Sequence, residues 1–132
     1  MTNGKNLGTK KNWKAGILMP YSYDTEIGYI ITNDHKETFV TSGIYERYFQ
    51  QDGVLYHHIL NPDTGMPCNN ELLSVTIIAE SGILCDCLST GCFVMGMEDA
   101  MELIDGMEGV YAVFVDADYN VYYSEGAKNF VQ

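Results

Sequence analysis

The feature that most constrains the fold is a change of hydrophobic period near residue 80. Residues 72–79 (Leu-Leu-Ser-Val-Thr-Ile-Ile-Ala) are rich in β-branched side chains and almost entirely apolar, which is typical of a central strand covered on both faces. After Ser81, a suitable N-cap, apolar residues recur at helical spacing as far as Gly96, a suitable C-cap. The sequence therefore predicts a buried strand followed directly by a long helix over residues 81–96.

The remaining segments predict a sheet around this strand. The residue types at positions 33–35 and 51–53 are typical of turns. A second, short helix is expected over residues 98–106. Strand-like runs occupy residues 13–19, 28–32, 37–41, 45–50, 54–59, 110–115 and 120–124. We find no internal repeat or interdomain linker, so we expect a single α+β domain over residues 1–132, a mostly antiparallel sheet with the two helices packed on it.

The charge distribution restricts the partners. The net charge is −11, and four of the seven basic residues lie in the first 14 positions, so the rest of the chain is strongly acidic. An acidic body argues against nucleic acid and against an anionic membrane surface, because both require a basic face. No stretch approaches the roughly 20 apolar residues of a transmembrane helix, and the N-terminus lacks the apolar run of a signal peptide. As written, the chain is expected to be cytoplasmic.

Two patterns that resemble metal sites do not match the known spacings. The four cysteines include neither C-x-x-C nor a Cys/His zinc spacing, and on a helix Cys85 and Cys87 would point about 200° apart. We expect reduced, mostly buried thiols, with a surface thiol or an oxidised pair as the alternatives.

The D-x-D-x-N run at residues 116–120 is followed by Val121 where an EF-hand loop has glycine, so it predicts a hairpin turn.

Two adjacent histidines, His57 and His58, stand at the end of a predicted strand. Because neighbouring strand side chains face opposite sides, one should face the interior or a site and the other should face outward. Residues 61–65 (Asn-Pro-Asp-Thr-Gly) follow as a strong turn signal. An imidazole beside such a turn could lie above backbone N–H groups that hold a phosphate, although a strand histidine is more often an ordinary core or surface group.

A carboxylate and a hydroxyl share one face of the predicted long helix. Asp86 and Thr90 are four residues apart, and their face lies close to the apolar stripe. A buried carboxylate needs a partner, and Mg²⁺, which takes oxygen ligands in octahedral geometry, would provide one. The alternative is a hydrogen bond between the two side chains with no metal.

Several ordered motifs together resemble the ApbE family, the FAD:protein FMN transferases. The resemblance runs from about Asn6 to the end of the chain. It rests on residues 6–10 (Asn-Leu-Gly-Thr-Lys) with 13–17 (Trp-Lys-Ala-Gly-Ile), on 41–49 (Thr-Ser-Gly-Ile-Tyr-Glu-Arg-Tyr-Phe), on 58–65 (His-Ile-Leu-Asn-Pro-Asp-Thr-Gly) and on 86–90 (Asp-Cys-Leu-Ser-Thr). The last two are similar to the family's His-Ile-x-Asp/Asn-Pro-x-Thr-Gly and Asp-x-x-x-Thr signatures.

This resemblance implies a reaction at the pyrophosphate of FAD. Mg²⁺ neutralises the phosphates, FMN passes to a Thr or Ser hydroxyl of an acceptor protein, and AMP leaves; some relatives use water and act as FAD pyrophosphatases. The resemblance makes His58 the base or the group that positions the acceptor, and it makes Asp86 and Thr90 Mg²⁺ ligands with Ser89 beside them. The residues implied at the flavin-nucleotide site are Ser42, Gly43, Leu60, Pro62, Thr64 and Gly65.

The resemblance also implies that part of the family's machinery is missing. Family members are about twice as long, are often exported lipoproteins, and place much of the flavin-binding surface and another metal ligand in an N-terminal half without a counterpart here. We therefore expect an incomplete enzyme that self-associates or that a second chain completes. The alternative is a non-catalytic remnant that binds flavin or protein.

Overall fold

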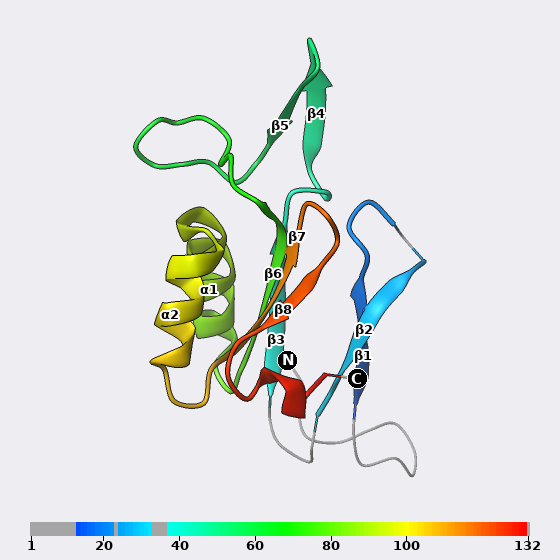
Figure 1. Cartoon of the computed structure of the whole chain (residues 1–132), viewed down its shortest axis with the longest axis vertical. Coiled ribbons are helices and arrows are strands. Elements are labelled where there is room, and N and C mark those ends of the chain that lie inside the picture. The colour runs from blue at the N-terminus through cyan, green and yellow to red at the C-terminus, as the bar shows by residue number, and fades with distance from the viewer. Residues whose placement is uncertain (1–12, 23, 33–36, 132) are drawn as a thin grey trace.

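The computed structural model describes residues 13–22, 24–32 and 37–131, and it confirms an α+β architecture (Figure 1). The helices of the described chain are α1 (Gly82–Met95) and α2 (Met97–Asp105), and a 3₁₀ turn, η1 (Ala127–Asn129), lies near the C-terminus. The strands are β1 (Lys14–Leu18), β2 (Glu26–Ile31), β3 (Thr38–Gly43), β4 (Tyr48–Gln51), β5 (Val54–His57), β6 (Leu72–Ala79), β7 (Tyr111–Asp116) and β8 (Val121–Tyr123).

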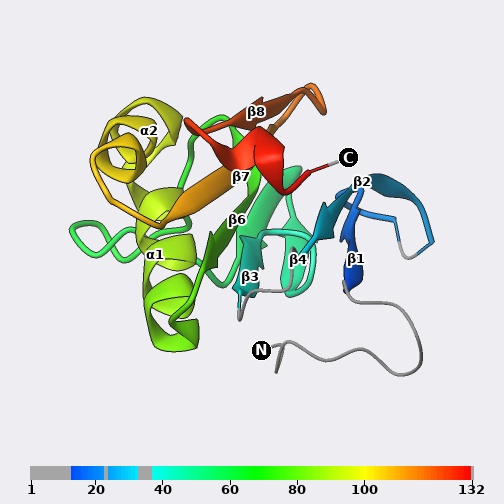
Figure 2. The same cartoon turned by 90° about the horizontal axis from the view of Figure 1, so that it is seen from below.

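The strands pair antiparallel throughout the described chain, but they form three sheets. β3, β6, β7 and β8 form a four-stranded sheet in the order β3-β6-β7-β8, while β1 pairs with β2 and β4 pairs with β5. Figure 2 shows α1 and α2 on one side of the four-stranded sheet and the β1–β2 pair on the other. The β4–β5 hairpin projects beyond the end of this sheet (Figure 1).

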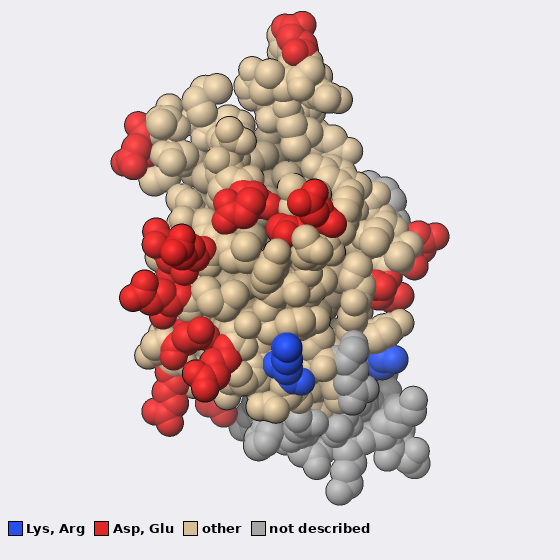
Figure 3. Space-filling model, viewed as in Figure 1, with Lys and Arg blue, Asp and Glu red and all other residues tan. Residues whose placement is uncertain are grey.

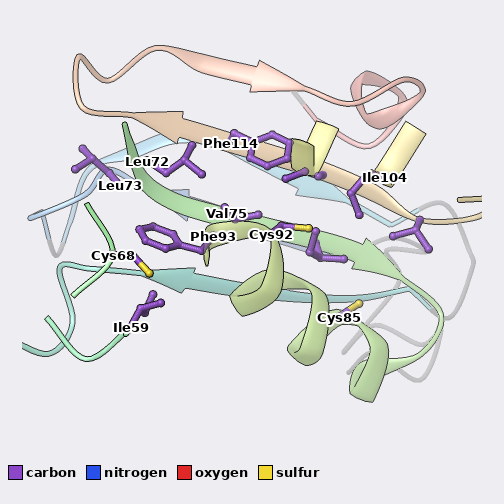
Figure 4. Close-up of a cluster of buried hydrophobic side chains, with 14 of the residues drawn as sticks. Ile59, Cys68, Leu72, Leu73, Val75, Cys85, Cys92, Phe93, Ile104 and Phe114 are labelled. Atoms are coloured by element: carbon purple, nitrogen blue, oxygen red, sulfur yellow. The ribbon is translucent and has the colours of Figure 1, made fainter. Parts of the chain in front are cut away.

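Strand β6 is the centre of the fold, and all eight of its residues are buried. Val75 and Ile77 belong to the core between the sheet and the helices, which Figure 4 shows. Ile78 belongs to a second cluster with Ile17 of β1 and Ile30 of β2. The prediction of a strand covered on both faces is therefore confirmed, and its apolar run is explained by burial from two sides.

The long helix begins and ends where its capping residues predict. Ser81 is the N-cap, and its side chain accepts a hydrogen bond from the backbone N–H of Leu84. Gly96 ends the helix at φ 88°, and its N–H donates to the carbonyl of Cys92. Neither α1 nor α2, the helices of the described residues, has the length and apolar character needed to cross a bilayer.

Several strand boundaries differ from the prediction. The strand expected over 45–50 begins only at Tyr48, because residues 44–47 turn away and the N–H of Ile44 donates to the carbonyl of Leu73. The strand expected over 54–59 ends at His57, because Ile59 enters the core and its carbonyl accepts from the N–H of Cys68. η1 was not predicted, and the turn predicted at 33–35 lies outside the described residues.

The cysteines are free, and three of the four are buried. Cys68, Cys85 and Cys92 lie in the core, where burial raises the pKa of each thiol, that of Cys92 to about 11. Cys87 is exposed on α1. The prediction of reduced and mostly buried thiols is therefore confirmed, and Cys87 is the reactive one by exposure.

The D-x-D-x-N run forms the turn between β7 and β8. The carboxylate of Asp116 accepts hydrogen bonds from the backbone N–H groups of Asp118 and Asn120, and from the Tyr122 hydroxyl. The Asn120 side-chain amide also donates to this carboxylate, and these hydrogen bonds hold the pKa of Asp116 below its usual range. The carboxylate is engaged in shaping the turn, as predicted.

The surface of the described chain is predominantly acidic. In Figure 3 acidic side chains are spread over much of the visible face, whereas basic side chains are confined to its lower part. A polyanion that approached this face would be repelled by the surrounding negative potential.

Candidate functional site

Three hydroxyl groups from distant parts of the sequence meet where β3 packs against α1. The Oγ of Ser42 lies 2.8 Å from the Oγ of Ser89 and 3.0 Å from the Oγ1 of Thr90. Ser89 is fully buried, and its hydroxyl donates to the carbonyl of Asp86 at 3.1 Å. We call Ser42, Ser89 and Thr90 the hydroxyl cluster. It joins two of the sequence motifs, which are 47 residues apart along the chain.

The carboxylate of Asp86 lies on the exposed face of α1, one turn before Thr90. The expectation that this carboxylate is close to buried is wrong, because the core side of the helix is formed by Cys85, Ser89 and Cys92 instead. The alternative of an Asp86–Thr90 hydrogen bond is also not observed, since the Thr90 hydroxyl bonds to Ser42. Within residues 13–22, 24–32 and 37–131, no hydrogen bond or ion pair engages the Asp86 side chain.

The donor set around Asp86 is chemically suited to a hard divalent cation. The Asp86 carboxylate lies one helical turn from the Thr90 hydroxyl of the hydroxyl cluster, and carboxylate and hydroxyl oxygens are donors of the kind that Mg²⁺ prefers. No group of three or more His, Cys, Asp and Glu side chains arranged for a metal occurs in the described part of the chain. A Mg²⁺ ion here would therefore take most of its ligands from water and from a bound phosphate, as it commonly does in phosphoryl-transfer sites.

The two histidines face opposite directions, as the strand pattern predicts. The His57 ring is buried, its Nε2 donates to the carbonyl of Cys68 at 2.9 Å, and it packs edge-on against the Phe93 ring at 6.1 Å. His57 therefore ties β5 to the core. His58 is exposed at the base of the β4–β5 hairpin.

The hydrogen bond of His58 fixes which of its nitrogens carries the proton. Its Nδ1 lies 3.2 Å from the backbone carbonyl of Arg47, and because a carbonyl can only accept, Nδ1 must carry the donated proton; in a neutral ring Nε2 then has none. The Nε2 atom is then left as a proton acceptor. This arrangement suits a general base, the role that the sequence predicts for His58.

A hollow of about 380 Å³ lies beside His58. It is lined by Arg47, Tyr48, Phe49, Tyr56, His57 and His58. Phe49 and Tyr56 are cross-strand partners whose rings stack at 5.0 Å with an interplanar angle of 6°. No sequence pattern predicted a site role for Arg47 or these aromatic residues, although Arg47 is the single arginine of the chain and immediately precedes the aromatic hairpin.

The turn at residues 61–65 does not offer backbone N–H groups to a phosphate. The side-chain oxygen of Asn61 accepts from the N–H groups of Asp63 and Thr64, and the N–H of Gly65 donates to the Asn61 carbonyl. Pro62 has no N–H. The idea that His58 stands above a phosphate-binding turn is therefore wrong for this segment. Leu60, Pro62, Thr64 and Gly65 are exposed, so a ligand would meet their side chains and apolar surface.

Gly43 makes room for a neighbouring ring. A Cβ atom at Gly43 would lie 2.6 Å from a ring carbon of Tyr45 and 3.2 Å from the Leu73 carbonyl oxygen. The Tyr45 ring is partly buried there, where burial raises the pKa of its hydroxyl. The structure thus shows a packing reason for glycine at this position.

We expect Gly43→Ala to lower the free energy of unfolding by about 1–3 kcal/mol, because the added methyl group must displace the Tyr45 ring or the backbone. Urea denaturation of the chain checks this value. Gly91→Ala is the matched control, since Gly91 is helical and has open space around a built Cβ, and it should raise stability by about 0.5–1 kcal/mol. Equal stability of Gly43→Ala and the unmodified chain would contradict the packing role.

The described structure groups the candidate residues into two places. Ser42, Ser89 and Thr90 meet where β3 packs on α1, one helical turn from Asp86. His58 directly follows β5, and the turn at residues 61–65 lies in the loop between β5 and β6, which extends to the side of the helices in Figure 1. Among the described residues, no hydrogen bond joins His58 to the hydroxyl cluster. A substrate long enough to reach both places would be needed to connect them.

Comparison with known proteins identifies related chains. The model of the ApbE family matches residues 1–114. The FAD:protein FMN transferase of Treponema pallidum (strain Nichols) is 39% identical over 114 residues, which cover 86% of this chain and 31% of that protein. The FAD:protein FMN transferase of Klebsiella pneumoniae (strain 342) is 38% identical over 120 residues, covering 89% of this chain and 37% of that protein.

Solved structures give the same result. The ApbE protein from Thermotoga maritima has a TM-score of 0.77 and 39% identity, covering 90% of this chain and 38% of that chain. The flavin transferase ApbE from Vibrio cholerae has a TM-score of 0.70 and 32% identity, covering 89% of this chain and 37% of that chain. The chain thus spans about a third of the length of the relatives it matches, a smaller share than the half that the motifs suggested.

Proposed function

This chain belongs to the ApbE family, and from that premise we propose that it forms one part of a Mg²⁺-dependent site that transfers FMN from FAD to an acceptor protein. The observation that carries the proposal is the hydroxyl cluster, which joins β3 to α1 one helical turn from the exposed Asp86. These groups come from two separate motifs, and their chemistry is that of oxygen ligands for a cation beside a pyrophosphate. The relatives bearing the name FAD:protein FMN transferase support FAD as the substrate.

The reaction exchanges one phosphorus–oxygen bond for another. The hydroxyl oxygen of a Thr or Ser on the acceptor protein forms a bond to the FMN-side phosphorus. The bond from that phosphorus to the bridging oxygen breaks, and AMP leaves with the electron pair. His58 would take the hydroxyl proton on Nε2, the atom left free by the hydrogen bond of Nδ1 to the Arg47 carbonyl. Water in place of the acceptor would give FMN and AMP, the FAD pyrophosphatase outcome.

Asp86 and Thr90 would hold the Mg²⁺ ion, with Ser89 beside them. Ser42 would keep the Thr90 hydroxyl in place through the 3.0 Å hydrogen bond. When bound, the ion would neutralise charge on the pyrophosphate, a contribution of several kcal/mol in related chemistry. The exposed segment with Leu60, Pro62, Thr64 and Gly65 would contact the flavin nucleotide through its surface, and Gly43 would contribute by shaping the end of β3.

The proposal is tested with a complete protein. We define the fusion protein as the Treponema pallidum relative in which this chain replaces the segment that it matches. With FAD, Mg²⁺ and an acceptor protein, the fusion protein should release AMP and increase the acceptor mass by one FMN. AMP release with no acceptor labelling would favour the pyrophosphatase outcome, and no AMP release by a folded fusion protein would favour the non-catalytic alternative.

We expect His58→Ala to slow acceptor labelling by a factor on the order of 10², the usual contribution of a general base. Gln50→Ala is the control, because Gln50 is exposed on β4 and has no proposed role in binding or proton transfer. Mass spectrometry of the acceptor over time gives both rates. Unchanged labelling by His58→Ala would rule out His58 as the base.

A further inference from the structure

The β4–β5 hairpin presents a group of aromatic rings to solvent. Phe49 is 59% exposed and Tyr48 is 50% exposed. The Phe49 ring stacks on that of Tyr56, and the edge of the Tyr48 ring meets the Tyr21 ring at 5.5 Å. The hairpin projects beyond the four-stranded sheet (Figure 1), so the sheet does not cover these rings. Exposed apolar residues that are grouped in this way mark interaction sites, whereas single ones do not.

Arg47 places a positive charge beside these rings. Lys14, Arg47 and Lys128 are the cations of the described residues. The Nζ atoms of Lys14 and Lys128 lie over the rings of Tyr29 and Tyr123, at 3.6 Å and 5.6 Å from the ring centroids. The Arg47 guanidinium makes no hydrogen bond, ion pair or ring contact with the described part of the chain. On a strongly acidic protein, an exposed and unengaged guanidinium favours a carboxylate supplied by a partner.

The hollow that Arg47 lines adjoins the proposed base and not the proposed metal ligands. All of its lining residues lie within residues 47–58 and include His58, whereas the hydroxyl cluster lies on β3 and α1. In phosphoryl transfer the attacking and leaving oxygens are roughly in line with the phosphorus between them. If the pyrophosphate is held near the hydroxyl cluster, the attacking hydroxyl has to arrive from the side of His58. The hollow is therefore placed for the acceptor protein and not for the leaving nucleotide.

Resting on the proposed function, we propose that the hollow beside His58 is the docking site for the acceptor protein. The acceptor segment that carries the reacting Thr or Ser lies across Phe49 and Tyr56, and a carboxylate of that segment pairs with Arg47. A hollow of about 380 Å³ accommodates a few side chains of such a segment. The rings supply rigid apolar contact area, and a guanidinium binds a carboxylate through two parallel hydrogen bonds. Arg47 is thus a specificity-determining residue and takes no part in the proton transfer.

The test compares two Michaelis constants of the fusion protein. The probe is the acceptor protein that the unmodified Treponema pallidum relative labels, and labelling is followed by mass spectrometry. Arg47→Glu should raise the KM for this acceptor at least about tenfold, because it places two like charges together, and should leave the KM for FAD within about twofold. The Arg47 carbonyl that holds His58 belongs to the backbone and is retained. A larger effect on the KM for FAD than on that for the acceptor would overturn the proposal.

Lys128→Glu is the matched control, because it reverses the charge of another exposed cation, in η1, and should change neither KM. Exchanging the charges then identifies the contact. Each acidic residue near the labelled residue of the acceptor is replaced by Lys, one at a time. One of these acceptor variants should be labelled faster by the Arg47→Glu protein than by the protein with Arg47. The absence of such a reversal for every variant would also overturn the proposal.

A binding measurement separates failure of the docking site from failure of the proposed function. The same acceptor is titrated into the fusion protein without FAD, by calorimetry, or into the chain alone if the fusion protein does not fold. The Kd should rise at least about tenfold in Arg47→Glu and stay unchanged in Lys128→Glu. This result with a folded fusion protein that releases no AMP would keep the docking site and reject flavin transfer. AMP release with acceptor binding that is absent or independent of Arg47 would do the reverse.

Discussion

Asp86→Asn should reduce AMP release from FAD by the fusion protein by a factor on the order of 10³, because the loss of a metal ligand removes several kcal/mol and each ~1.4 kcal/mol is a factor of ten. The substitution keeps the size of the side chain and removes its negative charge. The Asp86 side chain is exposed and accepts no hydrogen bond from the described residues, so the fold should be unaffected. The measurement is the rate of AMP release against Mg²⁺ concentration.

The control is Asp99→Asn, which removes a charge from the exposed first turn of α2. It changes the net charge by the same amount and should leave the dependence of AMP release on Mg²⁺ concentration unchanged. If both variants slowed the reaction equally, a general electrostatic effect would explain the loss. If Asp86→Asn kept the Mg²⁺ dependence of the unmodified protein, Asp86 would not be a ligand.

The second large effect is on stability. Phe93→Ala should lower the free energy of unfolding by about 3–5 kcal/mol, the range observed when a buried aromatic side chain is truncated. Phe93 is 1% exposed, lies in the core between the sheet and the helices (Figure 4), and packs against the His57 ring. Its loss removes the contact that ties the end of β5 to α1. Urea denaturation of the chain alone measures the change.

Phe49→Ala is the matched control, because it is the same substitution at a residue that is 59% exposed on the β4–β5 hairpin. It loses the stacked contact with Tyr56 and should cost about 1 kcal/mol or less. If both variants lost the same free energy of unfolding, the burial of Phe93 would not contribute to stability, contrary to its packing in the core.

The parts of the fold that could be predicted from the sequence are those in which local and long-range requirements agree. In β6 and α1, the apolar pattern, the N-cap Ser81 and the C-cap Gly96 all favour the same boundaries, and the structure has them. The β4 boundary could not be predicted in this way. The alternating pattern continues through Tyr45, but the chain turns there because Ile44 is bonded to Leu73, which is distant in sequence.

The candidate site, too, could be predicted from the sequence only in part. Helical spacing was sufficient to place Asp86 and Thr90 on one face, and strand alternation was sufficient to orient His57 and His58 oppositely. The contact of Ser42 with Ser89 and Thr90 depends on the packing of β3 against α1, and periodicity carries no information about it. For the same reason the sequence could not show that Asn61 occupies the turn N–H groups, since that depends on a side-chain rotamer.

A change of metal preference would show whether Asp86 is a metal ligand. Asp86→Cys is made in the fusion protein in a Cys87→Ser background, and AMP release from FAD is measured with Mg²⁺ and with Cd²⁺. A thiolate binds soft cations well and Mg²⁺ poorly. We expect this variant to lose the reaction with Mg²⁺ and to regain it with Cd²⁺, whereas the Cys87→Ser protein should prefer Mg²⁺. The same metal preference in both proteins would show that Asp86 is not a ligand.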